Sequence, residues 1–552
     1  MTQYNPNLTS VSTQTDNANY QSDPLSVYQL LCHDKENNLL LESAEITQKH
    51  LLKSLLLTDA AVKIVCNGNT VTYTALTLNG QAALQFAATQ LEPHAQLTLT
   101  DDNQTLTAFF GNIPTELDEK ARLMAINPFE SLRLFNRIKN NDNHHFAIFL
   151  GGAFAFDMIS MSEPLPQVQE GENTCPDFVY YLAETLVIID HELKSTEIIA
   201  NIFSAESQNI QAQVQQQLSA RVDEIKQQLL TTITPEHIPS LAAVKSSCAQ
   251  KISHADSQKV SVDISDEDFC QTVNQLKENI RAGDIFQVVP SRSFSLPCID
   301  SIAAYQALKI SNPSPYMFYL KDSDFCMFGA SPESAIKYQQ DSPEGKRQVE
   351  IYPIAGTRPR GFNKDGSISL DLDSRIELEL RQDKKESAEH IMLVDLARND
   401  IARVCKAGTR HVADLLKVDR YSHVMHLVSR VCGTLLEELD ALHAYQACMN
   451  MGTLSGAPKI KATSLIREVE GKRRGSYGGA VGYLTGEGEM DTCIVIRSAF
   501  VKDNIAHVQA GAGVVYDSVP QSEADETRQK AQAVISAVLL SNKASNSTQG
   551  AN

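Results

Sequence analysis

Two pairs of glutamates have the spacing of side chains that lie on one face of a helix. Glu386 and Glu389 are three positions apart, and Glu523 and Glu526 repeat this spacing near the C-terminal end. A hard divalent cation such as Mg²⁺ binds one or two carboxylates together with water and substrate oxygens. Two such pairs, contributed by two helices, could therefore hold a magnesium ion.

The same glutamates have a simpler interpretation. Glu386 lies four residues before His390, and Glu526 lies four residues before Lys530. Each could form an exposed i,i+4 pair, which contributes little to stability and needs no ligand. The residues by themselves leave both interpretations open.

Two short turns could bind a carboxylate through their backbone N–H groups. They are Gly356-Thr357 and residues 510–513, where glycine permits a close approach and unusual dihedral angles. Arg497 follows the strand-like run Cys493–Ile496 and could bind a carboxylate through two N–H groups. Each turn alone is equally typical of an ordinary hairpin.

Two further segments are ambiguous by themselves. His426 carries an imidazole, which titrates near neutrality and suits proton transfer, but a single histidine is more often packed or solvated. Gly452–Lys459 contains glycines and a lysine, yet its spacing is not that of a phosphate-binding loop. A nucleotide-binding function is therefore disfavoured.

The elements that must position these groups differ between the two halves of the chain. In the first half, short β-like runs recur at 61–66, 96–100, 146–150 and 185–189. Apolar residues at three- and four-residue intervals then predict an amphipathic helix over Ala205–Leu229. The first half should be rich in sheet and closed by this helix.

In the second half, the apolar residues from Phe269 to Ile280 lie on one face of a predicted helix that ends at Gly283. A strand over 285–289 follows. A C-terminal helix is predicted to begin with Ser522 as its N-cap. Because strands and helices mix irregularly, the fold class is α+β.

These patterns predict five segments along the chain. They are a flexible lead-in over 1–24, an N-terminal domain over 25–230, a linker over 231–263, a catalytic domain over 264–541 and a flexible tail over 542–552.

Composition excludes several classes of protein. The net charge of −19 and pI near 5.2 argue against a nucleic-acid partner, because phosphate binding needs clustered basic residues. No apolar run approaches the ~20 residues that cross a bilayer, and the polar start does not resemble a secretory signal. The 11 cysteines are scattered without metal-binding spacing. We therefore expect a cytoplasmic protein with no membrane contact.

Taken in order, six segments resemble the chorismate-utilising enzymes. The segments are Gly283–Arg292, Gly329–Glu333, Pro353–Gly361, Asp395–Asp400, Gly452–Lys459 and Gly511–Gly513. The resemblance covers roughly Asp266 to Val538. It implies a large antiparallel β-sandwich with surrounding helices, in which the N-terminal sheet-rich half packs with the C-terminal catalytic half.

The resemblance also implies the contents of an active site. Mg²⁺ would hold the ring carboxylate of chorismate, with Glu389 and Glu526 as the nearest ligands and Glu386 and Glu523 beside them. The implied substrate-binding residues are Gly356, Thr357, Tyr477, Arg497, Gly511, Ala512, Gly513 and Lys530. The implied catalytic residues are His426, which would handle the proton at the departing ring hydroxyl, and Gln287, Thr453 and Glu333.

Two positions distinguish between members of this family. Aminodeoxychorismate synthases commonly carry a nucleophilic lysine where this chain has Ala355, and isochorismate and salicylate synthases carry a lysine base where it has Gln287. Neither residue can act in those ways, and Gln287 suits guiding ammonia. The chain therefore resembles the large subunits of anthranilate synthases, lyases that catalyse the first committed step of tryptophan biosynthesis.

A feedback site for L-tryptophan is implied by the same resemblance. Its residues would be Leu41, Glu42, Ser43, Asn312, Pro315, Tyr316 and Met317. Each segment alone is equally typical of a strand end or a proline-rich loop. Together they predict allosteric inhibition, which needs two sites coupled by a conformational change.

A partner subunit is implied as well. The chain has no Gly-x-Cys-x-Gly turn of the kind that supplies an amidotransferase nucleophile. Ammonia would therefore come from glutamine through a separate amidotransferase subunit, in a heterotetramer with two copies of each. The alternative is a catalytically silent protein that binds tryptophan, and retention of the whole set of site residues argues against it.

Overall fold

The strands join into one extended sheet. The computed structural model describes residues 10–43, 53–114, 116–142, 144–203, 208–238, 241–242, 244, 260–342, 345–363, 365–421 and 424–549. In these ranges 23 strands form a continuous hydrogen-bonded network, and two more form a small separate sheet. Neighbouring strands are antiparallel apart from one parallel pair, β1 with β7. The predicted α+β class with a large antiparallel sheet is confirmed.

The strands fall into two consecutive groups along the chain. Those of the first half are β1 (Ser10–Ala18), β2 (Asn38–Glu42), β3 (Lys53–Asn67), β4 (Thr70–Ala75), β5 (Gln96–Leu99), β6 (Thr105–Phe109), β7 (Lys139–Asn140), β8 (Phe149–Phe154), β9 (Phe178–Asp190) and β10 (Ser195–Phe203). Those of the second half are β11 (Ser261–Val262), β12 (Gln287–Val288), β13 (Ser291–Pro297), β14 (Tyr316–Lys321), β15 (Cys326–Ser331), β16 (Ser334–Ser342), β17 (Gly345–Ile351), β18 (Ile354–Pro359), β19 (His411–Arg420), β20 (Val424–Thr434), β21 (Gly456–Ala457), β22 (Ala480–Thr485), β23 (Met490–Ile494), β24 (Ser498–Lys502) and β25 (Ile505–Gly511).

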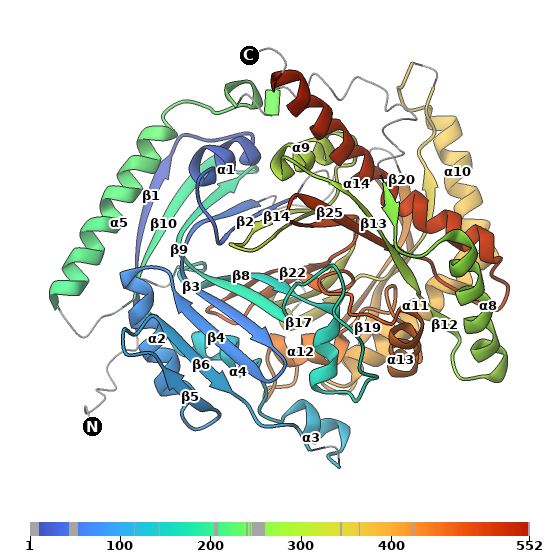
Figure 1. Cartoon of the computed structure of the whole chain (residues 1–552), viewed down its shortest axis with the longest axis horizontal. Coiled ribbons are helices and arrows are strands. Elements are labelled where there is room, and N and C mark those ends of the chain that lie inside the picture. Colours follow the sequence, from blue (N-terminus) through green and yellow to red (C-terminus); the bar gives the residue numbers. More distant parts are fainter. Residues whose placement is uncertain are drawn as a thin grey trace.

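The longer helices lie around the outside of the strands (Figure 1). The α-helices used below are α1 (Pro24–Cys32), α2 (Leu78–Leu91), α3 (Glu119–Leu123), α4 (Glu130–Arg133), α5 (Gln208–Gln228), α8 (Asp266–Ala282), α9 (Ser301–Ser311), α10 (Leu370–Gln382), α11 (Lys384–Ala402), α12 (Ala441–Cys448), α13 (Lys459–Glu470) and α14 (Pro520–Gln549). Short 3-10 turns are η1 (Leu134–Arg137), η2 (Phe156–Met161) and η3 (Pro235–His237). None of the helices in the described ranges is long and apolar enough to cross a membrane.

The two halves of the chain share strand pairs. Strand β2 lies between β3 of its own half and β14 of the second half, and β8 pairs with both β9 and β22. Backbone hydrogen bonds therefore cross from one half to the other at two places. The halves interleave rather than meeting only through side chains.

The flexible segments predicted at both ends are partly wrong. Ser10–Ala18 forms β1, because its backbone pairs with β10 almost two hundred residues later. At the other end, α14 continues to Gln549 through the predicted tail. Residues 1–9 and 550–552 lie outside the described ranges. The predicted linker over 231–263 contains η3 and β11, and its Leu241 packs into the core.

In the second half of the chain, the sequence patterns predicted the bounds of helices and strands more accurately than at the two ends of the chain. Helix α8 begins after Ser265, whose side chain accepts from the Asp268 N–H, and ends at Gly283 with φ of 82° in the left-handed region. The predicted strand over 285–289 is shorter, since only Gln287–Val288 pair with β21. Helix α14 begins at Pro520, so the predicted N-cap at Ser522 is wrong.

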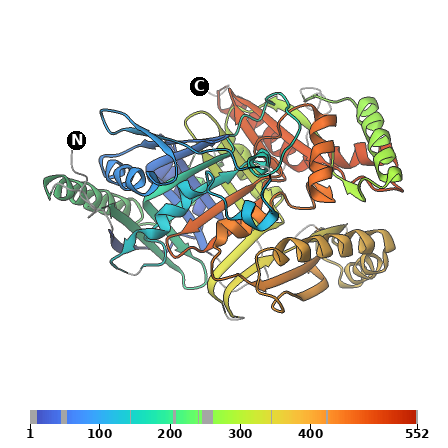
Figure 2. The ribbon, with the colours of Figure 1, turned by 90° about the horizontal axis from the view of Figure 1, so that it is seen from below.

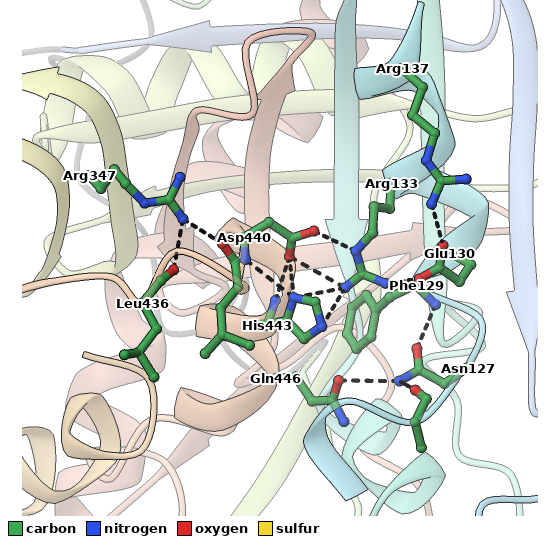
Figure 3. A network of polar contacts seen from close by, with 12 residues as sticks. Asn127, Phe129, Glu130, Arg133, Arg137, Arg347, Leu436, Asp440, His443 and Gln446 are labelled. Carbon is green, nitrogen blue, oxygen red and sulfur yellow. Dashed lines mark hydrogen bonds and ion pairs between the residues drawn. The ribbon is translucent and has the colours of Figure 1, made fainter. Parts of the chain in front are cut away.

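A polar network at one end of α12 also joins the halves (Figure 3). Arg133 donates to the Asp440 carboxylate and to Glu130, and Asp440 accepts the backbone N–H of His443 as the N-cap of α12. Asn127 donates to Gln446 on the same helix. Helix α12 is thus held by side chains from the first half of the chain.

Candidate active site

A cavity that we call the central cavity lies between α11 and α14. Its volume is about 610 Å³, within the range of sites that bind small molecules. Figure 2 shows α10 and α11 on one side of the molecule and α8 and α14 on the other. The wall contains most of the predicted site residues, namely Gln287, Asn312, Pro315, Glu333, Gly356, Thr357, Glu386, Glu389, His426, Thr453, Tyr477, Arg497, Gly511, Gly513, Glu526 and Lys530.

Some predicted residues lie beside the cavity rather than in its wall. Ala512 is buried and its N–H donates to the Pro290 carbonyl, while Glu523 is buried behind Glu526. The remaining residues outside this wall are Leu41, Glu42, Ser43, Tyr316 and Met317. Tyr316 lines a second cavity of about 210 Å³.

Helices α11 and α14 place the glutamates. Asp383 caps α11 by accepting the N–H groups of Lys385 and Glu386, so the first turn carries Glu386 to the cavity and the second carries Glu389. Glu523 lies in the first turn of α14 and Glu526 one turn later. The prediction that each pair belongs to a helix is confirmed.

Each carboxylate in the cavity wall has a polar partner. Glu386 pairs with Arg358 at 3.1 Å, and Glu526 pairs with Lys530 at 2.7 Å. Glu389 accepts a hydrogen bond of 3.1 Å from the Gln287 amide. The expected i,i+4 pair therefore forms between Glu526 and Lys530, although in a cavity wall, and does not form between Glu386 and His390, because His390 is buried.

The glutamates also affect each other's charge. Burial raises the pKa of Glu389, and the neighbouring Glu386 and Glu526 raise it further. Burial raises the pKa of Glu523 as well, with Glu526 adding to the rise. Burial also opposes ionisation of Glu526, but Lys530 outweighs it and the pKa of Glu526 is lowered. Such mutual repulsion between carboxylates is relieved by a bound cation.

The donors fit Mg²⁺ in kind. In the described ranges, no three His, Cys, Asp or Glu side chains are grouped closely enough to hold a metal ion by themselves. Magnesium is usually held by one or two carboxylates, with water and substrate oxygens completing six positions. Glu389 and Glu526 supply two carboxylates from two helices to the wall of one cavity.

Glu333 lies in a site that favours its neutral form. The residue follows β15 and is almost completely buried. Burial raises its pKa to about 8, although the Thr453 hydroxyl, the Ile354 N–H and Lys530 favour the charged form. At neutral pH Glu333 is therefore mostly a carboxylic acid that can donate a proton.

His426 lies in a site with the opposite preference. It belongs to β20, faces Thr357 of β18, and its Nδ1 is 2.8 Å from the Thr357 hydroxyl. Burial, together with the positive charge of Arg497, lowers its pKa to about 4. At neutral pH the imidazole is therefore neutral.

The turn at 511–513, predicted to bind an anion, needs glycine. A Cβ on Gly511 would lie 2.8 Å from the Pro290 carbonyl oxygen, and a Cβ on Gly513 would lie 2.9 Å from the Gln287 amide nitrogen. A larger residue at either position would therefore collide with its neighbours. Arg497 and Lys530 add positive charge to the same wall. The wall is suited to a substrate with more than one carboxylate.

Gln287 has an unused acceptor. Its amide nitrogen donates to Glu389, while its side-chain oxygen is buried and has no hydrogen-bond partner within the described ranges. A small molecule that donates N–H groups would satisfy this oxygen.

Sequence reasoning missed several residues of the site. Arg358 neutralises Glu386 and also pairs with Asp383, and Lys385 and Gln509 line the cavity. Arg358 lies within the Pro353–Gly361 segment, so its position in that motif was an available signal. The other two lie outside any motif.

Comparison with known proteins gives consistent matches. A family model described as chorismate binding enzyme matches residues 77–536. Anthranilate synthase component 1 of Vibrio cholerae is 56% identical over 525 residues, covering 95% of this chain and 95% of that protein. The protein of the same name from Escherichia coli is 53% identical over 526 residues, covering 95% and 96%.

Solved structures show the same fold. Anthranilate synthase component I of Streptococcus pneumoniae matches with a TM-score of 0.64 and 27% identity, over 89% of this chain and 95% of that one. The menaquinone-specific isochorismate synthase of Escherichia coli matches with a TM-score of 0.59 and 16% identity, over 96% and 95%. The second match concerns the fold alone.

Proposed function

The chain belongs to the chorismate-binding enzyme family, and from this membership we propose that it is the large subunit of an anthranilate synthase. The proposed reaction converts chorismate and ammonia to anthranilate, pyruvate and water. The observation that carries the proposal is Gln287, an uncharged amide in the cavity wall that donates to Glu389. Neither Gln287 nor Ala355 offers an amine nucleophile or base.

Magnesium is proposed as the cofactor. Glu389 and Glu526 would hold the ion, with Glu386 and Glu523 next to them. When bound, Mg²⁺ would supply Lewis-acid polarisation and fix the ring carboxylate of the substrate. The second carboxylate of chorismate would be bound by Arg497, by Lys530 and by the glycine turns at Gly356, Thr357, Gly511 and Gly513. Ala512, whose N–H donates to the Pro290 carbonyl, would hold the second turn in shape. Tyr477 closes the wall beside Gly511.

Proton transfer is proposed to involve Glu333 and His426. The ring hydroxyl leaves as water and therefore needs a proton, which Glu333 carries at neutral pH because its pKa is raised to about 8. Thr453 lines the same cavity wall. Formation of the aromatic ring removes a ring proton, and neutral His426 is suited to accept it. Family resemblance implied a role for His426 at the departing hydroxyl, and its low pKa leaves the ring without the extra proton at neutral pH.

A partner that hydrolyses glutamine is proposed as the source of ammonia, in a heterotetramer. The relatives' name, component 1, supports the existence of a second component. Tryptophan is proposed as a feedback inhibitor. In support, β2 with Leu41 and Glu42 pairs with β14 at Phe318 and Met317, and Asn312 and Pro315 just before β14 line the central cavity.

The proposal is tested with purified protein, chorismate, Mg²⁺ and ammonium. Anthranilate fluorescence and pyruvate should appear in equal amounts, disappear with EDTA, and fall when tryptophan is added. Glutamine should replace ammonium only when the amidotransferase subunit is present. Isochorismate or a non-aromatic amino product would contradict the proposal. Tryptophan binding without turnover would support the catalytically silent alternative.

A further inference from the structure

A chain of hydrogen bonds connects four elements behind the central cavity. The Leu416 N–H of β19 donates to the Ser429 hydroxyl of β20 over 3.0 Å. The same hydroxyl lies 2.6 Å from Nε2 of His390 on α11. Nδ1 of His390 lies 3.3 Å from the carbonyl oxygen of Ala355 on β18. His390 is completely buried and does not line the cavity.

The partners of His390 determine its protonation. A carbonyl oxygen only accepts, so Nδ1 must carry the hydrogen that bonds to Ala355. The Ser429 oxygen accepts from the Leu416 N–H and can donate its own hydrogen to Nε2 of His390. All four groups are satisfied by one arrangement of hydrogens.

The acceptor of this chain lies at an irregular point of β18. The pairing of β18 with β20 shifts register between Ala355 and Thr357, so the strand bulges at Gly356, where φ is 86°. Bulges often re-aim a side chain next to an active site. Here the bulge aims Thr357 at His426, and a Cβ on Gly356 would lie 3.3 Å from the Glu386 carboxylate.

We propose that His390, through a hydrogen on Nδ1, is a positioning residue that holds the Ala355–Gly356 bulge against α11. By doing so it places Thr357 at His426 and places α11 so that Glu386 and Glu389 face the cavity. The proposal rests on the proposed function for its catalytic consequence. It goes beyond that function by assigning a role to a residue that contacts no substrate.

Side-chain amides allow the two bonds to be tested separately. In His390→Asn the amide nitrogen takes the place of Nδ1 and can still donate to Ala355, whereas in His390→Gln the longer amide reaches toward Ser429 instead. His390→Phe removes both bonds, and Ser429→Ala removes only the serine link. Asp400→Asn is the matched control, because it weakens the buried pair with Lys459 near the other end of α11.

We expect kcat/KM for chorismate to fall about 10- to 100-fold in the Phe and Gln variants, as for small displacements of reacting groups. Their dissociation constants for Mg²⁺ by calorimetry should rise as well. The Asn variant should stay within about threefold of wild type, and Ser429→Ala and Asp400→Asn should lower the melting temperature with less effect on kcat/KM. Equal losses in the Asn and Gln variants, or losses that follow melting temperature across all five, would overturn the proposal.

Histidine ¹⁵N NMR provides a readout that needs no turnover. The signal that disappears in His390→Asn should show a hydrogen on Nδ1 that bonds to a carbonyl oxygen. A ring without a hydrogen on Nδ1 would also overturn the proposal. If wild type forms no anthranilate while this signature is present, the proposed function has failed and the hydrogen-bond assignment remains.

Discussion

Burial shifts the pKa values of two side chains of the central cavity in opposite directions. Burial favours the neutral form of each group. A carboxyl group is neutral when it carries a proton, whereas an imidazole ring is neutral when it has lost its second proton. Glu333 is thus an acid and His426 a base at the same pH. Opposite protonation states of two buried groups are typical of acid–base catalysis.

Glu333→Gln should lower kcat about 10²-fold or more, because the amide cannot donate a proton as an acid does. KM for chorismate should change little. In wild type, kcat should decline as pH rises through about 8, where the carboxyl group ionises. Glu350→Gln is the control, since Glu350 is also buried but pairs with Arg430 on β20. A full kcat in Glu333→Gln, measured by anthranilate fluorescence between pH 6 and 9.5, would contradict the role.

His426→Gln should change how stability depends on pH. The folded pKa of about 4 lies below the unfolded value near 6.5, so the unfolded chain binds more protons between these values. Stability is therefore lost as pH falls through this window. Replacing His426 should reduce the loss between pH 7 and pH 5 by about 1–2 kcal/mol. Urea unfolding at both pH values measures this, and identical losses in the two proteins would count against a lowered pKa.

At the scale of elements, two helices and one irregular strand form the site. Helices α11 and α14 each supply two glutamates, and β18 supplies the bulge that faces them. The bulge needs glycine for two independent reasons. The backbone is left-handed at Gly356, and side-chain atoms of Leu380, Leu427 and Glu386 lie 3.2–3.3 Å from where a Cβ would be.

Gly356→Ala should therefore destabilise the protein by about 1–3 kcal/mol. It should also lower kcat/KM about tenfold or more, since Glu386 and Thr357 would be displaced. Gly366→Ala separates the two reasons, because Gly366 has φ of 85° but no atom within 4 Å of the added Cβ. Gly366→Ala should also lower the free energy of unfolding, because its backbone is left-handed, but kcat/KM should stay normal. Equal catalytic loss in both variants would refute the specific contact with the site.

On the scale of the whole molecule, the two halves depend on each other. Strand pairs β2–β14 and β8–β22 cross between them, and the network in Figure 3 holds α12. The segment after α12 carries Thr453 into the central cavity. Support for the site therefore extends into the first half of the chain.

Arg133→Met should destabilise the whole chain by about 2–4 kcal/mol, because the partly buried negative charge of Asp440 loses its ion pair with Arg133. Asp440→Asn removes the charge but keeps a side chain that caps α12 well. The double variant should be less destabilised than the sum of the two by about 1 kcal/mol or more. Urea unfolding provides these values, and additive effects would mean that the pair contributes nothing.

Ser43 substitution should weaken tryptophan inhibition and leave catalysis largely intact. Ser43 follows β2, whose neighbour β14 lies directly after the cavity-lining loop at Asn312 and Pro315. Coupling of 1–3 kcal/mol would raise the inhibitory concentration about 5- to 150-fold in Ser43→Phe. Ser219→Ala on α5 serves as a control. Unchanged inhibition, measured from anthranilate formation, would remove Ser43 from the feedback site.

Glu42 illustrates a limit of inference from sequence. It was predicted to bind tryptophan, a role that stays a prediction, and both of its oxygens have protein partners. Oε1 accepts from the Tyr305 hydroxyl over 2.6 Å and Oε2 pairs with Lys309 over 2.7 Å. Both partners lie on α9, more than 250 residues away in the chain, so no local pattern could reveal them.

Sequence by itself determined what depends on near neighbours and on motif. The three-residue spacing of Glu386 and Glu389, the helix end at Gly283 and the glycine turn at 511–513 are local, because backbone geometry and caps involve residues a few positions apart. The ordered motifs then brought the cavity residues into one predicted site. Ala355 and Gln287 excluded a lysine nucleophile and a lysine base at these two positions, which left the ammonia-using reaction as the expected one.

Only the tertiary structure decided which distant groups meet and how water is excluded from them. The partnership of Glu386 with Arg358, the hydrogen bonds of His390 and the pairing of β1 with β10 all join residues that lie apart in the chain. The protonation states of Glu333 and His426 also depend on the tertiary structure. Burial raises the pKa of Glu333 and lowers that of His426, and burial is a property of the packed molecule.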